Sequence, residues 1–173
     1  MKWLLIICGA ILVLVLLALV IASRIPRSHV ASRSAWISAR PAEVWKVITD
    51  IDQFPSWRAG VARVERLPDH NGFLSWREFD LHGQSVPYEV DEWNPPSRLV
   101  TRIADPRLPF GGTWTYEIQP SGGGSIVRIT EHGEIYNLLF RFIARCFFGY
   151  TSTMDSYLKA LGVKFGDTVV PQP

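Results

Sequence analysis

Cysteine and excess charge are both scarce in this sequence of 173 residues. Two cysteines, Cys8 and Cys146, are too few for a disulfide framework in a chain of this length. The 18 Lys and Arg residues nearly balance 16 Asp and Glu residues, so the large positive field typical of nucleic-acid binders is missing. Because 47% of the residues are hydrophobic and the net charge is only +2, the composition predicts an ordered domain and no nucleic-acid partner.

Motifs for metal, phosphate and nucleophilic chemistry are also missing. The four histidines form no His-Glu-x-x-His pattern, and there is no paired-cysteine motif or acidic calcium loop. The Gly122–Gly124 run lacks the Lys-Ser/Thr of a phosphate loop and is better explained as a hairpin turn. No Gly-x-Ser-x-Gly occurs, and Cys146 lies in an apolar stretch where packing is its simplest role. The sequence therefore predicts no metal, no cofactor and no catalytic nucleophile.

One long apolar run is present near the N-terminus. Trp3 to Ala22 are twenty residues without a charge, which as a helix would span the roughly 30 Å hydrocarbon core of a bilayer. A cleaved signal peptide is the alternative, but its apolar core is about 7–15 residues long and a more polar run precedes the cleavage site. We therefore expect a retained transmembrane anchor over residues 1–22.

The residues after this run predict a linker and an orientation. A short linker is expected over 23–28, with Pro26 preventing continuation of the helix. Only Lys2 precedes the run, whereas four arginines follow it: Arg24, Arg27, Arg33 and Arg40. The positive-inside rule then favours a single-pass membrane protein whose remaining chain lies on the cytoplasmic side.

Hydrophobic periodicity predicts an α+β domain over residues 29–165 and a C-terminal tail over 166–173. A strand over 30–38 precedes a helix over 41–50 and a short turn capped by Asp52. Six further strands, separated by Gly, Asn and Pro turn residues, are expected over 61–67, 73–81, 85–93, 99–104, 113–119 and 125–135. Their short spacers predict antiparallel hairpins.

A long amphipathic helix from Asn137 to about Leu161 is expected to close the domain. Its predicted inward stripe has helical spacing and comprises Phe140, Ile143, Phe147, Tyr150, Met154, Leu158 and Leu161. Arg141 and Arg145 fall on the opposite side, and Gly149 is expected to bend the helix. Since a curved sheet cannot bury its concave face alone, the helix should cover it and leave an apolar gap.

Several motifs resemble the START-like helix-grip superfamily, also called SRPBCC or polyketide cyclase/dehydrase-like. They are Ser38-Ala39-Arg40-Pro41-Ala42-Glu43-Val44-Trp45, Ile48-Thr49-Asp50, Phe54-Pro55-Ser56-Trp57 and the later Thr130-Glu131. The resemblance covers about residues 29–165. It implies a curved antiparallel sheet wrapped around a long C-terminal helix, with a cavity for a lipid or another apolar molecule beneath that helix.

Aromatic residues are the strongest pointer to a ligand site, because twenty of them lie after residue 22. We expect the cavity to be lined by Trp57, Trp76, Tyr88, Trp114, Tyr116, Glu131, Phe140, Phe147, Tyr150 and Met154. The buried hydroxyls of tyrosines would need partners, which makes them good ligand contacts. The alternative is that these side chains simply fill the core.

Acid–base chemistry requires only one or two shifted groups inside such a cavity. Glu78, Asp80 and His82 share one strand face, whereas Glu131 and His132 point to opposite faces of a later strand. Glu131 is the most interesting of these. Its candidate roles are an ion pair with Arg102 or Arg128 and a structural hydrogen bond. Solvent exposure is the simplest expectation for each, and no catalytic residue is predicted.

The segment Leu138 to Phe148 is apolar around most of its circumference, broken by Arg141 and Arg145. Such a helix is either packed on several sides or touches lipid. The loop over 105–112 adds Leu108 and Phe110 near the expected cavity mouth. These features favour a pocket held close to a membrane.

Three hypotheses follow from the sequence. The favoured one is a membrane-tethered, non-enzymatic binder or carrier of a lipid or other hydrophobic small molecule. The second is a cyclase- or dehydratase-like enzyme acting on a hydrophobic substrate. The third is an interaction protein whose cavity has collapsed, which predicts an interior without a void.

Overall fold

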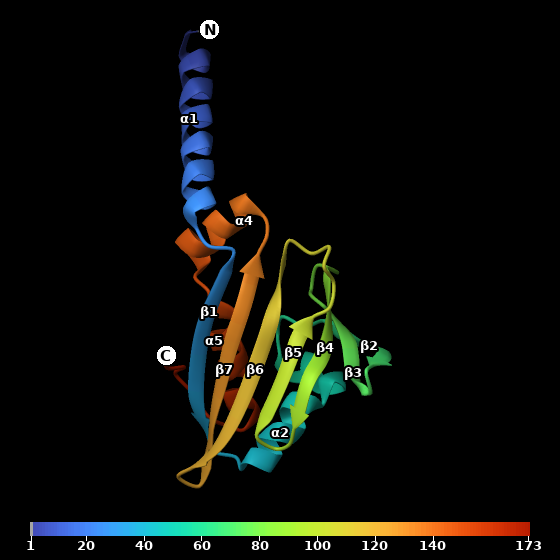
Figure 1. Cartoon of the computed structure of the whole chain (residues 1–173). Helices are drawn as coiled ribbons and strands as arrows, with labels where there is room; N and C mark the ends of the chain where they lie inside the picture. The colour runs from blue at the N-terminus through green and yellow to red at the C-terminus, as the bar shows by residue number, and fades with distance from the viewer. Residues whose placement is uncertain (1) are drawn as a thin grey trace.

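The structure, a computed structural model, describes residues 2–173, without the side chains of Phe147 and Phe148. Seven antiparallel strands form one curved sheet in the order β1-β7-β6-β5-β4-β3-β2 (Figure 1). Their bounds are β1 Ser28–Ile37, β2 Arg63–His70, β3 Phe73–Phe79, β4 Ser85–Asn94, β5 Arg98–Ile103, β6 Phe110–Ser121 and β7 Gly124–Ile135. Helices cover the concave face of the sheet, so the α+β helix-grip fold and the predicted succession of hairpins are confirmed.

Helix α1, Lys2–Arg24, extends away from the rest of the molecule (Figure 1). Ala22 is its one buried residue among those described, and most of its other apolar side chains have no protein covering. By length and composition α1 is able to cross a membrane, and a signal sequence has the same properties. Ile25 to Arg27 are the three residues that separate it from β1.

Strand β1 joins the two ends of the domain by pairing with β7. The register runs from Ser28 opposite Glu134 to Ile37 opposite Ser125. The C-terminal tail also joins this edge, because the backbone N–H groups of Ser34 and Gln172 each donate to the other's carbonyl at 2.8 Å. These pairings hold the strand that follows α1 firmly within the sheet.

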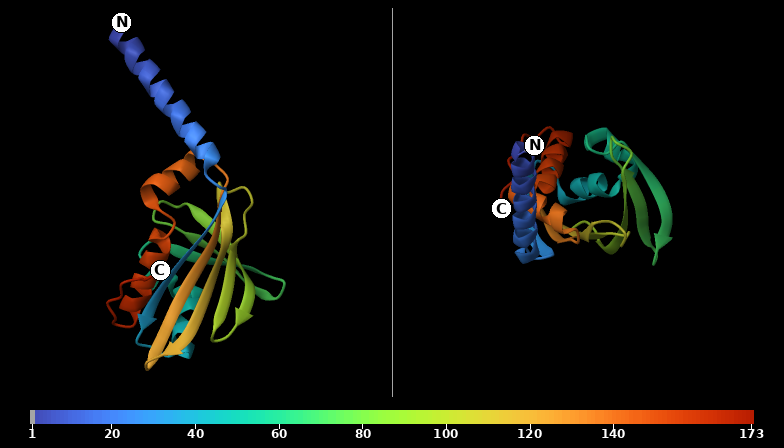
Figure 2. Two further views of the ribbon diagram at one scale, coloured as in Figure 1. Left: turned by 60° about the vertical axis from the view of Figure 1, so that its left-hand side comes forward. Right: turned by 90° about the horizontal axis from the view of Figure 1, so that it is seen from above.

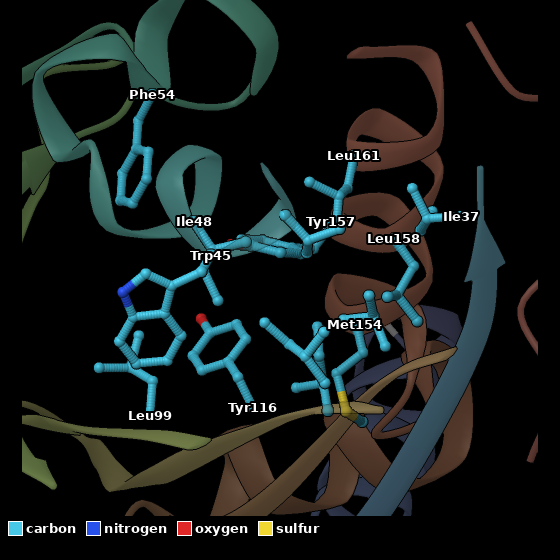
Figure 3. Packing of buried hydrophobic residues seen from close by; sticks show 14 of the residues in the cluster. Ile37, Trp45, Ile48, Phe54, Leu99, Tyr116, Met154, Tyr157, Leu158 and Leu161 are labelled. Atoms are coloured by element: carbon cyan, nitrogen blue, oxygen red, sulfur yellow. The ribbon is translucent and has the colours of Figure 1, made fainter. Parts of the chain in front are cut away.

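The core lies between the sheet and two helices, α2 Pro41–Thr49 and α5 Ser152–Lys164. Helix α2 begins where Pro41 occupies the first turn and Glu43 accepts a hydrogen bond from the Arg40 N–H, the expected start of a helix. Its apolar side faces the apolar side of α5 and the strands, as Figure 3 shows for Trp45, Ile48 and the labelled residues of α5. The most deeply buried residues of α5 are Met154, Leu158 and Leu161.

The expected single long C-terminal helix is wrong. The segment forms α4 Leu138–Ile143, the π-helical η2 Ala144–Phe148, and the separate helix α5. Asn137 caps α4, since its side chain accepts a bond from the Phe140 N–H at 2.9 Å. The break occurs at Gly149, whose φ of +69° suits glycine and cannot continue a right-handed helix. The predicted bend is thus a complete interruption.

Arg141 also departs from the expected outward position, because it is only 4% exposed. Its guanidinium donates to the carbonyls of Ile135, at 2.8 and 3.0 Å, of Tyr136 at 3.3 Å and of Ile25 at 3.1 Å. It therefore joins the end of β7 to the chain just after α1.

Asp52 does not cap the short turn after α2. That turn consists of η1 Ile51–Gln53 and α3 Phe54–Trp57, and neither has a side-chain cap. The Asp52 carboxylate instead accepts hydrogen bonds from the guanidinium of Arg66 on β2. An ion pair with a neighbouring strand has replaced the local backbone contact that the sequence suggested.

Candidate ligand-binding cavity

A cavity of about 400 Å³ lies between the curved sheet and the helices. Its inner end is formed by residues of α2, α3, β3, β4, β5 and β6, several of them buried, such as Ile48, Phe54, Trp76 and Leu99. This volume is within the range of roughly 300–1,000 Å³ typical of small-molecule sites. The hypothesis of a collapsed interior is therefore wrong.

The cavity opens at the end from which α1 departs. Its exposed lining residues all belong to the segment from the end of β7 to the start of α5: Glu134, Phe140, Gly149, Ser152 and Thr153. Phe110 and Gly111, at the start of β6, line the same end. Figure 1 shows that α4 and the beginning of β6 lie on the side of the domain next to α1. The break between α4 and α5 thus forms part of the mouth.

An ion pair faces the inner cavity. Arg58, just after α3, donates from its two terminal nitrogens to the two carboxylate oxygens of Glu78, at 2.8 and 2.9 Å. The indole N–H of Trp76 donates to the same carboxylate at 3.1 Å. The guanidinium also lies over the rings of Phe54 and Tyr157, at 4.7 and 5.2 Å from their centroids. This arrangement holds both charges rigidly.

Burial opposes the charge on Arg58, but the attraction and hydrogen bonds of Glu78 exceed that effect and raise the pKa of the guanidinium. For the phenols of Tyr88, Tyr116 and Tyr157, burial itself raises the pKa, and the negative charge of Glu78 adds to the shift. All three phenols therefore stay protonated at neutral pH and are able to donate hydrogen bonds.

A second polar group lies nearer the mouth. Burial lowers the pKa of His29 and raises that of Glu131, whose carboxyl also accepts a bond from Trp114 that partly offsets the shift. The Nε2 atom of His29 lies 3.9 Å from Oε1 of Glu131. The imidazole stacks on the Tyr150 ring with 3.8 Å between centroids. Burial thus favours the uncharged form of both the imidazole and the carboxyl.

Seven of the ten sequence-predicted residues line the cavity: Trp76, Tyr88, Trp114, Tyr116, Glu131, Phe140 and Tyr150. Met154 instead lies in the core between α5 and the sheet. Trp57 packs edge-on against Phe54 and Tyr157 behind the lining. The Phe147 side chain lies outside the described residues. Contact of any of these residues with a ligand stays a prediction.

The sequence-based list lacks Arg58 and His29, whereas Phe110 of the loop expected near the cavity mouth does line the cavity. Arg58 directly follows the Phe54-Pro55-Ser56-Trp57 motif, but its partner Glu78 is twenty residues away, and no local spacing connects the two. His29 on β1 faces Glu131 on β7 because these two strands, which are far apart in the sequence, are paired in the sheet. Such pairings depend on sheet topology, which single-strand patterns do not encode.

The remaining acid–base candidates lie elsewhere. Asp80 accepts bonds from the backbone N–H groups of His82 and Gln84 and so organises the exposed turn between β3 and β4. His132 and Arg128 are exposed. Arg102 lines the cavity but is bound to Glu89 and Asp91 rather than to Glu131. Of these candidates, Glu78 and Glu131 face the cavity.

Within residues 2–173, no three His, Cys, Asp or Glu side chains are grouped so as to hold a metal ion. Both described cysteines are free thiols.

Comparison with solved structures shows many proteins of this fold. A START superfamily protein from Mycobacterium smegmatis superposes with a TM-score of 0.62 at 16% identity, over 79% of this chain and 97% of that chain. Norcoclaurine synthase from Thalictrum flavum gives 0.62 at 10% identity, over 79% and 86%. The di-domain ARO/CYC StfQ of the steffimycin biosynthetic pathway gives 0.63 at 12% identity, over 80% of this chain and 51% of that chain. At these identities the likeness concerns the fold alone.

Sequence comparison identifies the family. No curated protein matches the chain. The family described as polyketide cyclase / dehydrase and lipid transport, however, matches residues 28–155, which begin at β1 and end in α5. The match includes every strand of the sheet and all of the cavity lining. The chain therefore belongs to the polyketide cyclase / dehydrase and lipid transport family, in agreement with its curved sheet, its covering helices and its open-ended cavity.

Proposed function

We propose that this protein is a membrane-tethered binder of a lipid or another hydrophobic small molecule, held in the cavity between the sheet and the helices. The observation that carries the proposal is the cavity itself, which is open at one end and lined mainly by apolar and aromatic side chains. Burial of ligand surface there would contribute about 25 cal/mol per Å² of apolar area. The family description, which includes lipid transport, agrees with this activity.

The apolar surface of α1 supports a membrane tether. A helix of this length whose apolar side chains are mostly uncovered by protein is stable in a bilayer, where its backbone groups are satisfied internally. The arginines beyond it favour a cytoplasmic domain.

The surroundings of the mouth support its placement at the bilayer surface. Leu138 and Leu139 at the start of α4 are 41% and 54% exposed, and α4 lies beside the lower end of α1 (Figure 2). Arg24, Arg27 and Arg145 are exposed nearby and, within the described chain, have no carboxylate at ion-pair distance. Exposed apolar residues flanked by unpaired cations are typical of a surface that contacts anionic headgroups. The ligand would then enter from the membrane.

Binding is tested with the full chain in nanodiscs and the neutral fluorescent probe N-phenyl-1-naphthylamine. We expect saturable binding above that of empty nanodiscs. Ala144, 7% exposed, lines the cavity near the mouth, so Ala144→Trp should fill that space and weaken binding by about tenfold or more. The exposed Ala59, outside the cavity, supplies the control Ala59→Trp. Equal binding by wild type and Ala144→Trp would contradict the proposal.

Tethering is tested by extraction of membranes at alkaline pH and by intact mass. The full-length protein should stay in the membrane pellet and keep residues 2–22. A soluble product that has lost them would identify a cleaved signal sequence instead. Protease treatment of sealed inside-out vesicles should degrade the domain if it is cytoplasmic.

Cyclase- or dehydratase-like catalysis is the second candidate, favoured by the His29–Glu131 pair. A neutral imidazole and a carboxyl whose pKa is raised by burial lie 3.9 Å apart at a cavity wall, and groups of these two kinds are able to act as a general base and a general acid. The polyketide cyclase part of the family description agrees with this candidate. A poly-β-ketone thioester mimic offered to the full chain should cyclise or lose water, and Glu131→Gln should abolish turnover while the protein stays folded. An unchanged rate in that variant would exclude this role.

A further inference from the structure

The inner end of the cavity carries a charge pair that is already complete. Glu78 receives both terminal nitrogens of Arg58 as well as the indole N–H of Trp76. The pair is mostly buried, with side-chain exposures of 20% for Arg58 and 12% for Glu78. Its net charge is zero, so this end of the cavity presents dipoles and hydrogen-bond donors rather than a field of one sign.

The other charged groups of the lining offer no free cation. Among the described lining residues, Arg102 is the second cation, and it is bound by Glu89 and Asp91. The remaining charged groups of the lining are the carboxyl groups of Glu131 and Glu134, with His29 kept neutral by burial. An anionic ligand group would lose its hydration without gaining an unpaired positive partner, which is unfavourable.

Hydrogen-bond donors remain available at the inner end. Arg58 has five N–H groups, and the bonds to Glu78 occupy two of them. The Tyr116 hydroxyl is hydrogen-bonded to Tyr157, but the protonated hydroxyl of Tyr88 and the hydroxyl of Thr101 line the same region. These groups suit an uncharged oxygen that accepts hydrogen bonds, such as a ketone, ester or alcohol.

From this arrangement we infer that the protein selects apolar molecules whose inner end carries a neutral oxygen acceptor, and that it rejects chains ending in a carboxylate. The inference deepens the proposed function and rests on it. It assigns Arg58 and Glu78 as a unit that determines specificity: Arg58 supplies donors to the ligand, and Glu78 cancels the charge that would attract a fatty acid.

The test compares decan-2-one, decan-1-ol, decanoate and decylamine, which share one alkyl chain and differ in the polar end. Each displaces N-phenyl-1-naphthylamine from the full chain in nanodiscs near neutral pH, with partition into empty nanodiscs measured in parallel. The ketone and the alcohol should bind at least about tenfold more tightly than decanoate and decylamine. Equal or tighter binding of decanoate or decylamine overturns the inference while leaving the proposed function standing. Failure of the probe itself to bind overturns both.

A substitution tests the cause of the preference. Glu78→Gln keeps the side-chain shape but leaves the charge of Arg58 uncompensated, so decanoate should gain affinity by about tenfold relative to decan-2-one. Glu65→Gln on the exposed strand β2 is the matched control and should keep the wild-type preference. An unchanged preference in a folded Glu78→Gln protein overturns the assigned role of the pair. If that variant does not fold, the wild-type series still decides the inference.

Discussion

The clamp made by Arg141 permits a quantitative prediction. Arg141→Met removes the guanidinium that binds the carbonyls of Ile135, Tyr136 and Ile25, while an unbranched side chain still fills most of the space. A hydrogen bond to a charged group contributes about 1.5–3 kcal/mol, and a carbonyl left without its partner costs a similar amount. Water will reach the carbonyls nearer the surface, so we expect a total loss of roughly 2–4 kcal/mol.

For a domain of this size, 1 kcal/mol corresponds to about 2–4 °C in Tm, so Arg141→Met should lower the Tm by roughly 5–15 °C. The assay is thermal unfolding of the full chain in nanodiscs, followed by circular dichroism of the β-sheet signal. Arg145→Met is the matched control, because Arg145 is exposed on the next turn and has no ion pair in the described chain. A Tm within about 2 °C of wild type would refute the structural role assigned to Arg141.

Two further substitutions test the core and the cavity wall. Met154→Ala, at a position with no exposed surface, should cost about 2–5 kcal/mol of unfolding free energy in thermal or chemical denaturation. The control Lys159→Ala, on the exposed side of α5, should cost little. A small loss at Met154 would show that the core is loosely packed. Burial raises the pKa of Glu131 above its usual value near 4.5, so this carboxyl favours the folded state below that pH, and its contribution is lost as the pH rises through the folded pKa. Glu131→Gln should therefore raise the Tm near pH 7.5, and this gain should disappear below about pH 4.5. A gain in Tm that is largest in acid would contradict the sign of the shift.

Local patterns were sufficient for most of the fold. Strand alternation, turn residues and the Pro41 helix start predicted elements within a few residues of their observed bounds. The resemblance carried by Val44-Trp45 and Phe54-Pro55-Ser56-Trp57 predicted the architecture as a whole. These features succeed because each depends on residues close together in the chain.

The C-terminal segment shows where such patterns fail. Helical spacing connects Phe140 with Leu161 on paper, but the left-handed conformation at Gly149 ends that periodicity and turns α5 in a new direction. The same spacing assigned Arg141 to solvent, whereas two carbonyls at the end of β7 and the distant carbonyl of Ile25 stabilise it inside. Backbone carbonyls have no signature in the sequence, so their attraction for a cation is not predictable from it.

The candidate site was predictable in part for a related reason. Aromatic residues on successive strands indicated one face, and seven of the ten predicted residues do line the cavity. The bond between Arg58 and Glu78 required knowledge of how the loop after α3 lies against β3. The polar character of the inner end therefore became visible only in three dimensions.

The short connection between α1 and β1 limits how far the domain is able to move from the helix. The three residues from Ile25 to Arg27 reach at most about 10 Å when fully extended, and the Ile25 carbonyl is itself bound by Arg141. If α1 spans a bilayer as proposed, a domain attached this closely would have no freedom to carry a ligand through the water to a second membrane. Ligand exchange would then be confined to the leaflet beside the domain, or to a recipient that approaches it there.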